Sequence, residues 1–425
     1  MTSSGSEPRV AGQRLLDRLG RLAAIGADPA GGVTRPAYSP EDVRARELTA
    51  GWMAEAGLDV WVDEAGNLFG RLPGSDGFPA ALVAGSHLDS VTRGGPLDGP
   101  AGVLSALEAA AALRQAGTVL RHDLVVAAFS NEEGARGTPG MVGSKAVAGL
   151  LTTDDLARPD AEGVVLADRI RQAGGDPERI GGAAWVPGRM AAFLELHIEQ
   201  GPVLEAGRAR IGVVSAITGQ VKVTAVITGE PNHAGTTPMS LRRDAATAAA
   251  RLVLAVETLA ADGHVRVATT GVLTIGPGVG NVIPGEATLG IDLRDGDADC
   301  IEAAVKLLDE WAADIARRTG TRIDLRPGPV QRPVATDPGL SACVTRAAES
   351  LGAPWLAMPS GAGHDAQIIA AIAPVAMVFV PSVGGVSHAP TEATAPDDLI
   401  MGADVVLRAL LAADRWAVER KSPAV

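Results

Sequence analysis

The sequence predicts an α/β fold with a mainly parallel sheet, into which a smaller α+β domain is inserted. From residue 80 onward, apolar runs that are typical of buried strands alternate with alanine-rich helical segments. This alternation indicates a parallel sheet with helices on both faces. Near residue 213 the order of elements changes to βαββαβ, and after residue 330 the α/β alternation resumes. We therefore expect one domain formed by residues 1–212 and 331–425, and an inserted domain formed by residues 213–330.

The first part of the chain supplies two helices and a hairpin. An amphipathic helix is expected near residues 8–24. Residues 39–57 predict a second helix, with Ser39 as its N-cap, a proline at the first helical position and Gly57 as the stop. Residues 60–74 (VWVDEAGNLFGRLPG) then predict a β-hairpin, with the turn at Ala-Gly-Asn.

Four apolar runs predict the buried strands of the parallel sheet. They are ALVAG, DLVVAAF, MAAFLEL and VAMVFV, at residues 81–85, 123–129, 190–196 and 375–380. An alanine-rich helix is expected at residues 101–117, between the first two strands.

The inserted domain is expected to contain four strands and two helices. The strands are predicted at 214–229, 265–276, 286–294 and 321–327, and the helices at 240–262 and 298–320. In the order βαββαβ both helices cover one face of a single sheet, which leaves the other face or an edge free to pair.

The composition excludes several classes of protein. Hydrophobic residues make up 46% of the chain and charged residues 20%, as in a globular protein and unlike a disordered one. The net charge of −13 argues against nucleic-acid binding, which needs a basic face. The longest apolar stretch, 368–380, is interrupted by Pro374 and is too short to span a bilayer, and the N-terminus lacks the apolar core of a secretory signal. We expect a cytoplasmic enzyme with neither nucleic-acid nor membrane partners.

Residues suited to bind metal follow the predicted strands. In chain order they are His87, Asp98, Glu133, His197 and His388. The two cysteines have no CxxC partner, so the ligands must be nitrogen and oxygen donors, which suit Zn²⁺ or Mn²⁺. Because the carboxyl ends of parallel strands meet at one crevice, we expect these side chains to converge there. If one aspartate bridges two divalent ions, Glu132 remains as a base, and such an arrangement hydrolyses amide-type bonds.

Each of these residues has an ordinary structural explanation when it is taken alone. His87 and Asp89 form an H-x-D step, which is more often a loop histidine beside a turn aspartate; here we expect the Asp89 carboxylate to hold the ring of His87. Asp98 is also suited to be a helix N-cap. Neighbouring glutamates such as Glu132 and Glu133 are usually solvated.

The histidines have similar alternatives. His197 alternates with apolar residues and is suited to a core position, and His388 lies in a glycine-rich loop and is suited to a turn. Together with the carboxylates, however, they place donors at four independent strand ends, which favours a metal site. His122 and His264 lack this context and are expected at the surface.

Over nearly its full length the chain resembles a known family. It is similar to the hydantoinase/carbamoylase branch of the M20 dinuclear metallo-amidohydrolases, which are related to the zinc aminopeptidases. That branch includes N-carbamoyl-L-amino-acid hydrolases, allantoate amidohydrolases and β-ureidopropionases, which the motifs do not separate. The matching segments are GSHLDSV, GGPLDGPAGV, NEEGAR, ELHIEQGPVLE, HAGTTPM, NVIPG, DLR, SGAGHDA and FVPSVGGVSHAPTE.

The resemblance implies a zinc-aminopeptidase-like catalytic domain with two divalent ions per subunit, Zn²⁺ or Mn²⁺, with Co²⁺ or Ni²⁺ as further possibilities. It assigns His87 and His197 to one ion, Glu133 and His388 to the other, Asp98 to both, and the role of general base to Glu132. It also implies a cis peptide bond between Asp98 and Gly99.

The resemblance further implies that the inserted domain forms a homodimer and closes as a lid. His233 of HAGTTPM would complete the active site of the partner subunit. Substrate contacts are implied for Gln200, Gln220, Asn281, Arg294 and Gly363, the last through backbone donors.

The residues themselves support a role for Arg294 and also leave alternatives open. A guanidinium at a strand end is suited to clamp the carboxylate of a ureido acid in a two-pronged geometry. Arg294 is equally suited to pair with Asp292 or Asp295, and Asn281 and His233 are suited to be loop residues.

The leading function is hydrolysis of the carbamoyl C–N bond of an N-carbamoyl-L-amino acid or related ureido acid, with release of ammonia and carbon dioxide. Allantoate or β-ureidopropionate is the alternative substrate. Aminopeptidase or aminoacylase activity is a second hypothesis, and the resemblance of HIEQGPVLE counts against it. A binding protein that has lost catalysis is a third, and the presence of all five ligand-type residues and Glu132 counts against that.

Overall fold

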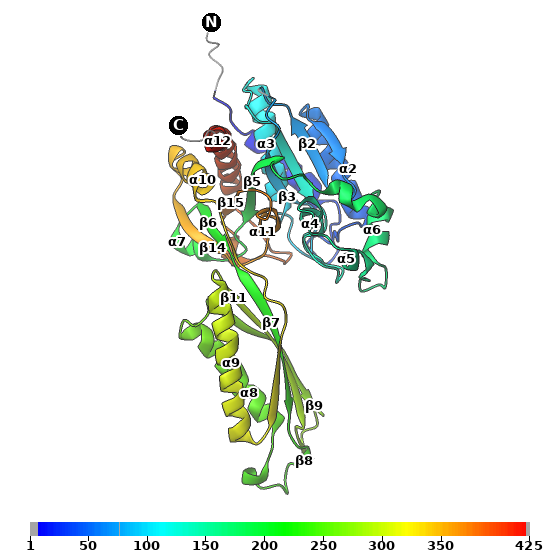
Figure 1. The fold of residues 1–425 in the computed structure, drawn as a ribbon, viewed down its shortest axis with the longest axis vertical. Coiled ribbons are helices and arrows are strands. Elements are labelled where there is room, and N and C mark those ends of the chain that lie inside the picture. The colour runs from blue at the N-terminus through cyan, green and yellow to red at the C-terminus, as the bar shows by residue number, and fades with distance from the viewer. Residues whose placement is uncertain (1–6, 76, 422–425) are drawn as a thin grey trace. The chain divides into compact units, whose positions relative to one another are not determined.

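The computed structural model describes residues 7–75 and 77–421, which form parts of two compact units. The first unit comprises Met1–Ser215, Thr336–Ser360 and His364–Val425, and the second comprises Ala216–Ala335 and Gly361–Gly363 (Figure 1). Within the described ranges, no helix combines the length and the apolar character needed to cross a bilayer.

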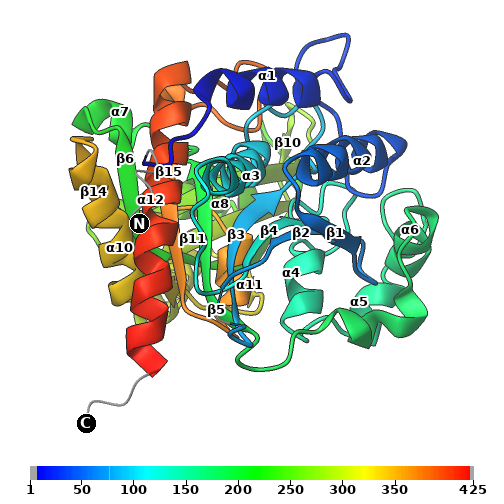
Figure 2. The same ribbon diagram turned by 90° about the horizontal axis from the view of Figure 1, so that it is seen from above.

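A mainly parallel sheet forms the centre of the first unit (Figure 2). Its strands lie in the order β1-β2-β4-β3-β5-β15-β6, and β14 also pairs with β6. Strands β3, β4, β5 and β15 are parallel, whereas β1, β2 and β6 run antiparallel to their neighbours. The bounds are β1 Asp59–Val62, β2 Leu68–Leu72, β3 Ala81–His87, β4 Leu124–Phe129, β5 Met190–Ile198, β6 Ile211–Ile217, β14 Trp355–Ser360 and β15 Val375–Val380.

The four parallel strands are those that the apolar runs predicted, and the predicted α/β fold class is confirmed. All of their residues are buried apart from the half-buried second residue of β5. β3 and β4 approach closely at Gly85, where a Cβ atom would lie 1.9 Å from the carbonyl oxygen of Ala127.

Helices cover both faces of this sheet (Figure 2). On one face, buried residues of five helices join alternate residues of the strands in one apolar core. These helices are α1 Gly12–Ala23, α2 Pro40–Glu55, α3 Pro100–Gln115, α10 Pro338–Ser350 and α12 Pro396–Lys421. The short helices α4 Val142–Val147 and α11 Asp365–Ile369 contact each other and lie on the opposite face. The connecting segments add α5 Thr153–Ala157, α6 Leu166–Gln172, η1 Pro177–Ala183, α7 Val203–Gly207 and η3 Val383–Gly385.

Local signals account for the first elements. Ser39 caps α2 by accepting the N–H of Asp42, and β1 and β2 form the predicted hairpin. α1 begins at Gly12, later than the expected residue 8, because the preceding chain is held elsewhere: the N–H of Val10 is donated to Asp404 of α12.

The second unit is a four-stranded antiparallel sheet with two helices on one face. The strand order is β12-β7-β11-β9, and the helices share one apolar core with β7 and β11. Both features agree with the pattern βαββαβ. The bounds are β7 Gly219–Thr228, α8 Ala245–Ala261, β9 Val267–Gly276, β11 Glu286–Asp295, α9 Ala298–Thr319 and β12 Arg322–Pro327. A separate ribbon pairs β8 Asn232–His233 with β10 Val282–Ile283, and β13 Val334–Ala335 pairs with the end of β6.

Two predicted bounds in this part of the chain differ from the structure. The strand expected at 214–229 is two strands, because β6 ends at Ile217 and β7 begins at Gly219. The helix expected from residue 240 begins at Ala245, because the side chain of Asp244 caps it by accepting two backbone N–H groups. The preceding residues form the separate turn η2 Met239–Leu241.

Candidate metal centre

The structure brings the five predicted ligands together at the carboxyl ends of the parallel strands. His87 is the last residue of β3, and His197 is the penultimate residue of β5. Glu133 and His388 lie in the loops that follow β4 and β15, and Asp98 lies in the loop between β3 and α3. Gly99 is the N-cap residue of α3, so the Asp98 side chain does not cap that helix.

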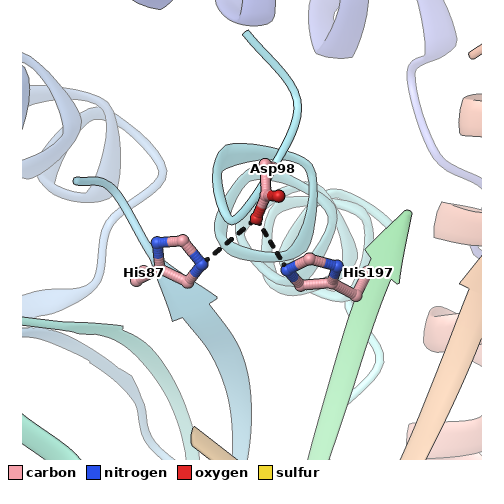
Figure 3. Close-up of side chains that lie close together, drawn as sticks. All are labelled: His87, Asp98 and His197. Carbon is pink, nitrogen blue, oxygen red and sulfur yellow. Dashed lines mark ion pairs between the residues drawn. The ribbon is translucent and has the colours of Figure 1, made fainter. Parts of the chain in front are cut away.

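Asp98 lies between His87 and His197, whose rings both face its carboxylate (Figure 3). Its Oδ1 atom lies 3.5 Å from His87 Nε2 and 3.1 Å from His197 Nε2, and its Oδ2 atom lies 3.2 Å from His388 Nε2. Glu133 Oε2 lies 3.5 Å from the same His388 nitrogen. Asp98 therefore belongs to two candidate metal-binding groups, His87–Asp98–His197 and Asp98–Glu133–His388, in each of which the donor atoms lie within 4.8 Å of one another.

The chain turns sharply between Asp98 and α3. Gly99 has a φ of 79°, and a Cβ atom at this position would lie 2.5 Å from the ring of His87. Glycine thus allows both the turn and the approach of the imidazole. The Asp98–Gly99 peptide bond is trans, so the cis bond implied by the resemblance is wrong.

Glu132 lies at the edge of this cluster. Its Oε2 atom is 3.9 Å from His87 Nε2, and its side chain is 10% exposed. Burial raises the pKa of Glu132 well above its usual range, although the charge of His87 opposes the shift. A carboxylate with a raised pKa is a stronger base than an ordinary glutamate and is suited to take a proton near neutral pH.

Asp89 supports the cluster differently from the expectation. The ring of His87 is held through Nδ1 by the backbone carbonyl of Asp89 at 3.0 Å, while the nearest carboxylate oxygen is 3.7 Å away. The Asp89 carboxylate instead accepts the backbone N–H groups of Glu132 and Glu133, each at 3.2 Å. Asp89 therefore connects the loop after β3 to the loop after β4.

Three residues that position Asp98 were not fully anticipated from the sequence. Glu392 accepts the backbone N–H groups of Leu97 and Asp98 at 3.0 and 3.1 Å. The hydroxyl of Ser387 has one hydrogen to donate and lies within hydrogen-bond distance of both Asp98 Oδ2, at 2.9 Å, and Glu392 Oε2, at 3.0 Å. Gln200, which was expected to contact substrate, donates to Asp98 Oδ2 at 2.7 Å. The loop that carries His388 thus fixes the Asp98 loop as well.

Three residues of the loops around the cluster have backbone conformations that side chains rarely adopt. Asn131, Gln200 and His388 follow β4, β5 and β15 and have φ values of 53°, 60° and 55°. Such conformations are uncommon outside glycine and gather at functional sites, where the surrounding structure holds them. Hydrogen bonds from the Asn131 amide to Thr138 and Pro139 show one such restraint.

The cluster requires positive charge among its carboxylates. Burial raises the pKa of Asp98, but the charge of His197 and hydrogen bonds from the three histidines outweigh it and hold that pKa well below its usual range. Burial and the charge of Asp98 raise the pKa of Glu133 to about 7. The hydrogen bond to Asp98 raises the pKa of His388 to about 9, although burial opposes the shift. Protons on these groups balance the acidic charge, and a divalent cation fits the same requirement.

Two buried oxygen atoms of this cluster also fit a cation. Glu133 Oε1 and Gln200 Oε1 have no hydrogen-bond partner among the described residues. A buried acceptor without a partner is costly, and a cation bound between the side chains would satisfy it. A third group of donors, Glu195–His197–His364, fits less well, because Glu195 already accepts hydrogen bonds from Ser86 and from the backbone N–H of Ala366.

The other predicted substrate-binding residues lie in the second unit. Gln220 and Arg294 face each other across the β7–β11 pairing, and both donate to Asp292. Arg294 also donates to the carbonyl of Gly361 at 2.8 Å, near Gly363. The pairing of Arg294 with Asp292 is the alternative that the sequence left open, and it fixes a half-exposed guanidinium at the end of β11.

His233 and Asn281 lie side by side in the β8–β10 ribbon. His233 pairs with Val282, and the carbonyl of Asn281 accepts the N–H of Ala234. The Nδ1 atom of His233 accepts the N–H groups of Gly235 and Thr236 at 3.0 and 3.2 Å. In a neutral imidazole this arrangement leaves the proton on the exposed Nε2, which is then a hydrogen-bond donor.

The two histidines expected at the surface differ. His264 is exposed, but the prediction for His122 is wrong, because its side chain is fully buried. His122 Nδ1 lies 2.8 Å from Asp414 Oδ1, and its ring stacks on Phe78. Asp414 is 292 residues away in the chain, so local sequence could not show this contact.

An α/β sheet with imidazole and carboxylate donors at its carboxyl edge is typical of metal-dependent hydrolases. The chain belongs to peptidase family M20/M25/M40, which matches residues 83–412, and enzymes of this family generally use divalent metals. The resemblance to its hydantoinase/carbamoylase branch is confirmed.

Two curated relatives and one solved structure illustrate this relationship. An N-carbamoyl-L-amino acid amidohydrolase of Geobacillus stearothermophilus is 42% identical over 397 residues, which cover 93% of this chain and 97% of the relative. An allantoate amidohydrolase of Escherichia coli is 40% identical over 394 residues, which cover 92% of this chain and 95% of the relative. The solved structure of a hydantoinase/carbamoylase family amidase from Burkholderia multivorans is 40% identical, with a TM-score of 0.88. The match covers 95% of this chain and 98% of that chain.

The raised pKa values of Glu133 and His388 predict that metal affinity rises with pH. A cation binding between these side chains must displace their protons, so affinity should increase between pH 6 and about 9. Each displaced proton contributes about tenfold per pH unit. Competition with a chelator for Mn²⁺ across this range measures the effect. An affinity that does not change between pH 6 and 9 would contradict the assignment of these two ligands.

Proposed function

We propose that this hydrolase of non-peptide carbon–nitrogen bonds cleaves the carbamoyl group of an N-carbamoyl-L-amino acid or a related ureido acid. The products would be the amine, ammonia and carbon dioxide. The observation that carries the proposal is the convergence of four imidazole and carboxylate residues around Asp98, with Glu132 beside them. The similarity to curated carbamoyl and allantoate amidohydrolases supports the choice of substrate class.

The candidate centre is suited to hold two divalent ions. His87 and His197 would hold one, Glu133 and His388 the other, and Asp98 both, since it belongs to both groups. The mixture of imidazole and carboxylate donors fits Zn²⁺ or Mn²⁺. When bound, such ions polarise a carbonyl and make water more acidic.

Glu132 would transfer protons in the reaction. It takes a proton from the attacking water as the new bond to the ureido carbonyl carbon forms. It then gives that proton to the nitrogen of the amino acid as the C–N bond breaks, and the released carbamate decays to ammonia and carbon dioxide. Its raised pKa, caused by burial, suits both steps, and its backbone N–H is fixed by Asp89.

Arg294 and His233 would recognise the substrate from the inserted domain. The guanidinium of Arg294 is held by Asp292, which accepts from Nε and Nη2, and by the carbonyl of Gly361, which accepts from Nη1. A substrate carboxylate would bind the remaining N–H groups of Nη1 and Nη2, with Gln220 beside them. His233, with Nε2 as a donor, is suited to stabilise the oxyanion that forms at the carbonyl. Asn281 and the backbone near Gly363 would add polar contacts.

A homodimer through the inserted domain is the expected assembly. Strand β9 pairs only with β11 among the described strands, so it leaves one edge of the sheet open. Val267, Val272, Leu273 and Ile275 of this strand are between 42% and 54% exposed, and Val272 and Leu273 are successive residues that point to opposite faces. Edge-to-edge pairing with β9 of a second copy would cover them. The partner subunit would then receive His233.

The substrate class is tested by a panel of ureido compounds. We expect ammonia release, after loading with Mn²⁺ or Zn²⁺, from N-carbamoyl-L-amino acids, with allantoate and β-ureidopropionate as the alternative substrates. An N-carbamoyl amine without a carboxylate should be a poor substrate, because Arg294 then has nothing to bind. Hydrolysis of dipeptides or N-acetyl amino acids, with none of the ureido compounds, would contradict the proposal.

Glu132→Gln separates the base from the ligands. Without a carboxylate to accept the proton, turnover should fall by about 10²–10⁴-fold, while the metal content per chain stays unchanged. Metal analysis beside the ammonia assay measures both properties, and Glu133→Gln serves as the matched variant that should lose metal. A Glu132→Gln protein that also loses metal would place Glu132 among the ligands.

Mixing two inactive variants tests the role of His233. His233→Ala and Glu132→Gln chains are each expected to be inactive, whereas a heterodimer contains one site with both native residues and should regain activity. Heterodimers purified with two different affinity tags allow the measurement. If they show no activity, His233 serves its own chain or has no role in the reaction.

A further inference from the structure

Arg35 is a fully buried arginine outside the candidate metal centre. Its guanidinium donates to three backbone carbonyls: Nε to Leu88 at 2.7 Å, and Nη1 to Leu22 and Ile25 at 2.9 and 2.8 Å. Its Nη2 atom has no hydrogen-bond partner among the described residues. Burying a guanidinium costs free energy when no carboxylate pairs with it directly. If this position had only to fill space, an apolar side chain would do so at a lower free-energy cost.

Hydrogen bonds join the segment around Arg35 to the loop after β3. The N–H of Arg35 is donated to Ser90 Oγ at 3.0 Å, and the N–H of Ser90 is donated to the carbonyl of Arg35 at 2.9 Å. Val33 and Gly94 exchange two backbone hydrogen bonds, both at 2.9 Å. The hydrogen bonds from the segment around Arg35 therefore fix the conformation of the loop after β3.

The loop leads directly to the candidate centre. Leu88, whose carbonyl Arg35 binds, lies between His87 and Asp89. Asp89 in turn holds the ring of His87 through its carbonyl and the backbone of Glu132 and Glu133 through its carboxylate. A shift of the Leu88 carbonyl would therefore move the predicted ligand His87. Through Asp89 it would also move the loop that carries Glu132 and Glu133.

Charge supports the same connection. Burial lowers the pKa of Arg35, and the negative charges of Asp42 and Asp89 act in the opposite direction. Arg35 and Asp89 are therefore close enough for their opposite charges to interact.

We propose that Arg35 is a positioning residue for the metal centre, which acts through Leu88 and Asp89 on His87, Glu132 and Glu133. This inference rests on the proposed function of the site. Arg35 touches neither substrate nor ligand atoms, and its effect is to keep the loop after β3 in the one conformation that aligns the donors. Groups that orient metal ligands in this way typically change metal affinity by about 10–100-fold when they are replaced.

Arg35→Lys is the sharpest test, because lysine keeps the charge but cannot donate to three carbonyls in a planar arrangement. We expect Mn²⁺ affinity, measured by chelator competition, to fall about 10–100-fold. With saturating metal, kcat should remain lowered, while KM changes little because the substrate contacts are intact. The visible absorption of the Co²⁺-substituted protein should also change, since it reports the arrangement of the ligands.

Arg18→Lys is the matched control. Arg18 is also buried, lies on α1 and pairs with Glu108 at 2.7 Å, and its side-chain ion pairs are with Glu108 and Glu55, which are not in the loop after β3. Both variants should unfold at a lower temperature, and only Arg35→Lys should alter metal affinity, the Co²⁺ spectrum and kcat. Arg18→Lys should leave these properties within about twofold of the unmodified protein, as expected for a distant site.

The outcomes separate this inference from the proposed function. Suppose that the unmodified protein binds Mn²⁺ and hydrolyses ureido acids. If Arg35→Lys then loses stability but keeps its metal affinity, Co²⁺ spectrum and kcat, as Arg18→Lys is expected to do, Arg35 has only a structural role. If Arg35→Lys does not fold, Ser90→Ala decides by the same criteria, since it removes the hydroxyl that joins Arg35 to the loop. If the unmodified protein binds no divalent ion, the proposed function itself fails.

Discussion

The candidate site depends on one buried carboxylate. Asp98 is 3% exposed, and three histidines from three different loops or strands place a nitrogen between 3.1 and 3.5 Å from its oxygen atoms. A buried carboxylate requires compensating positive charge or hydrogen bonds, and here the imidazoles, Gln200 and Ser387 supply both. Asp98 belongs to both donor groups, so the two groups share a ligand only while its carboxylate keeps this position.

The parallel sheet explains how residues so far apart in sequence reach one place. β3, β4, β5 and β15 end at the same edge, and the last residues of these strands and the loops that follow them carry the donors. The loops are then fixed to one another: Asp89 connects the loop after β3 to the loop after β4, and Glu392 connects the loop after β15 to Asp98. The proposed positioning role of Arg35 extends this arrangement to the segment after α1.

Much of this could be predicted from the sequence, because the strands are continuous apolar runs and the donors follow them directly. The fold class, the capping of α2 by Ser39 and the convergence of the ligand-type residues depend on such local signals. Contacts that depend on the folded loops could not be predicted. Glu392 lies 294 residues from Asp98, and nothing near either residue indicates that they meet.

The roles of Asp89 and His122 show the same limit. An H-x-D step places a carboxylate near an imidazole, but the conformation of the loop decides whether the carboxylate or the backbone carbonyl faces the ring, and here it is the carbonyl. His122 has acidic neighbours in sequence, but it is buried by a partner at the far end of the chain. In both cases the sequence indicates which groups are present, and the tertiary structure determines which of them meet.

Anomalous diffraction from Mn²⁺-loaded crystals tests the central claim most directly. The account predicts two anomalous peaks per chain, one among His87, Asp98 and His197 and the other among Asp98, Glu133 and His388, with Asp98 bound to both. Crystals of Asp98→Ala should show neither peak at the same metal concentration. A single peak, or a peak among Glu195, His197 and His364, would contradict the claim that Asp98 is shared by two ions.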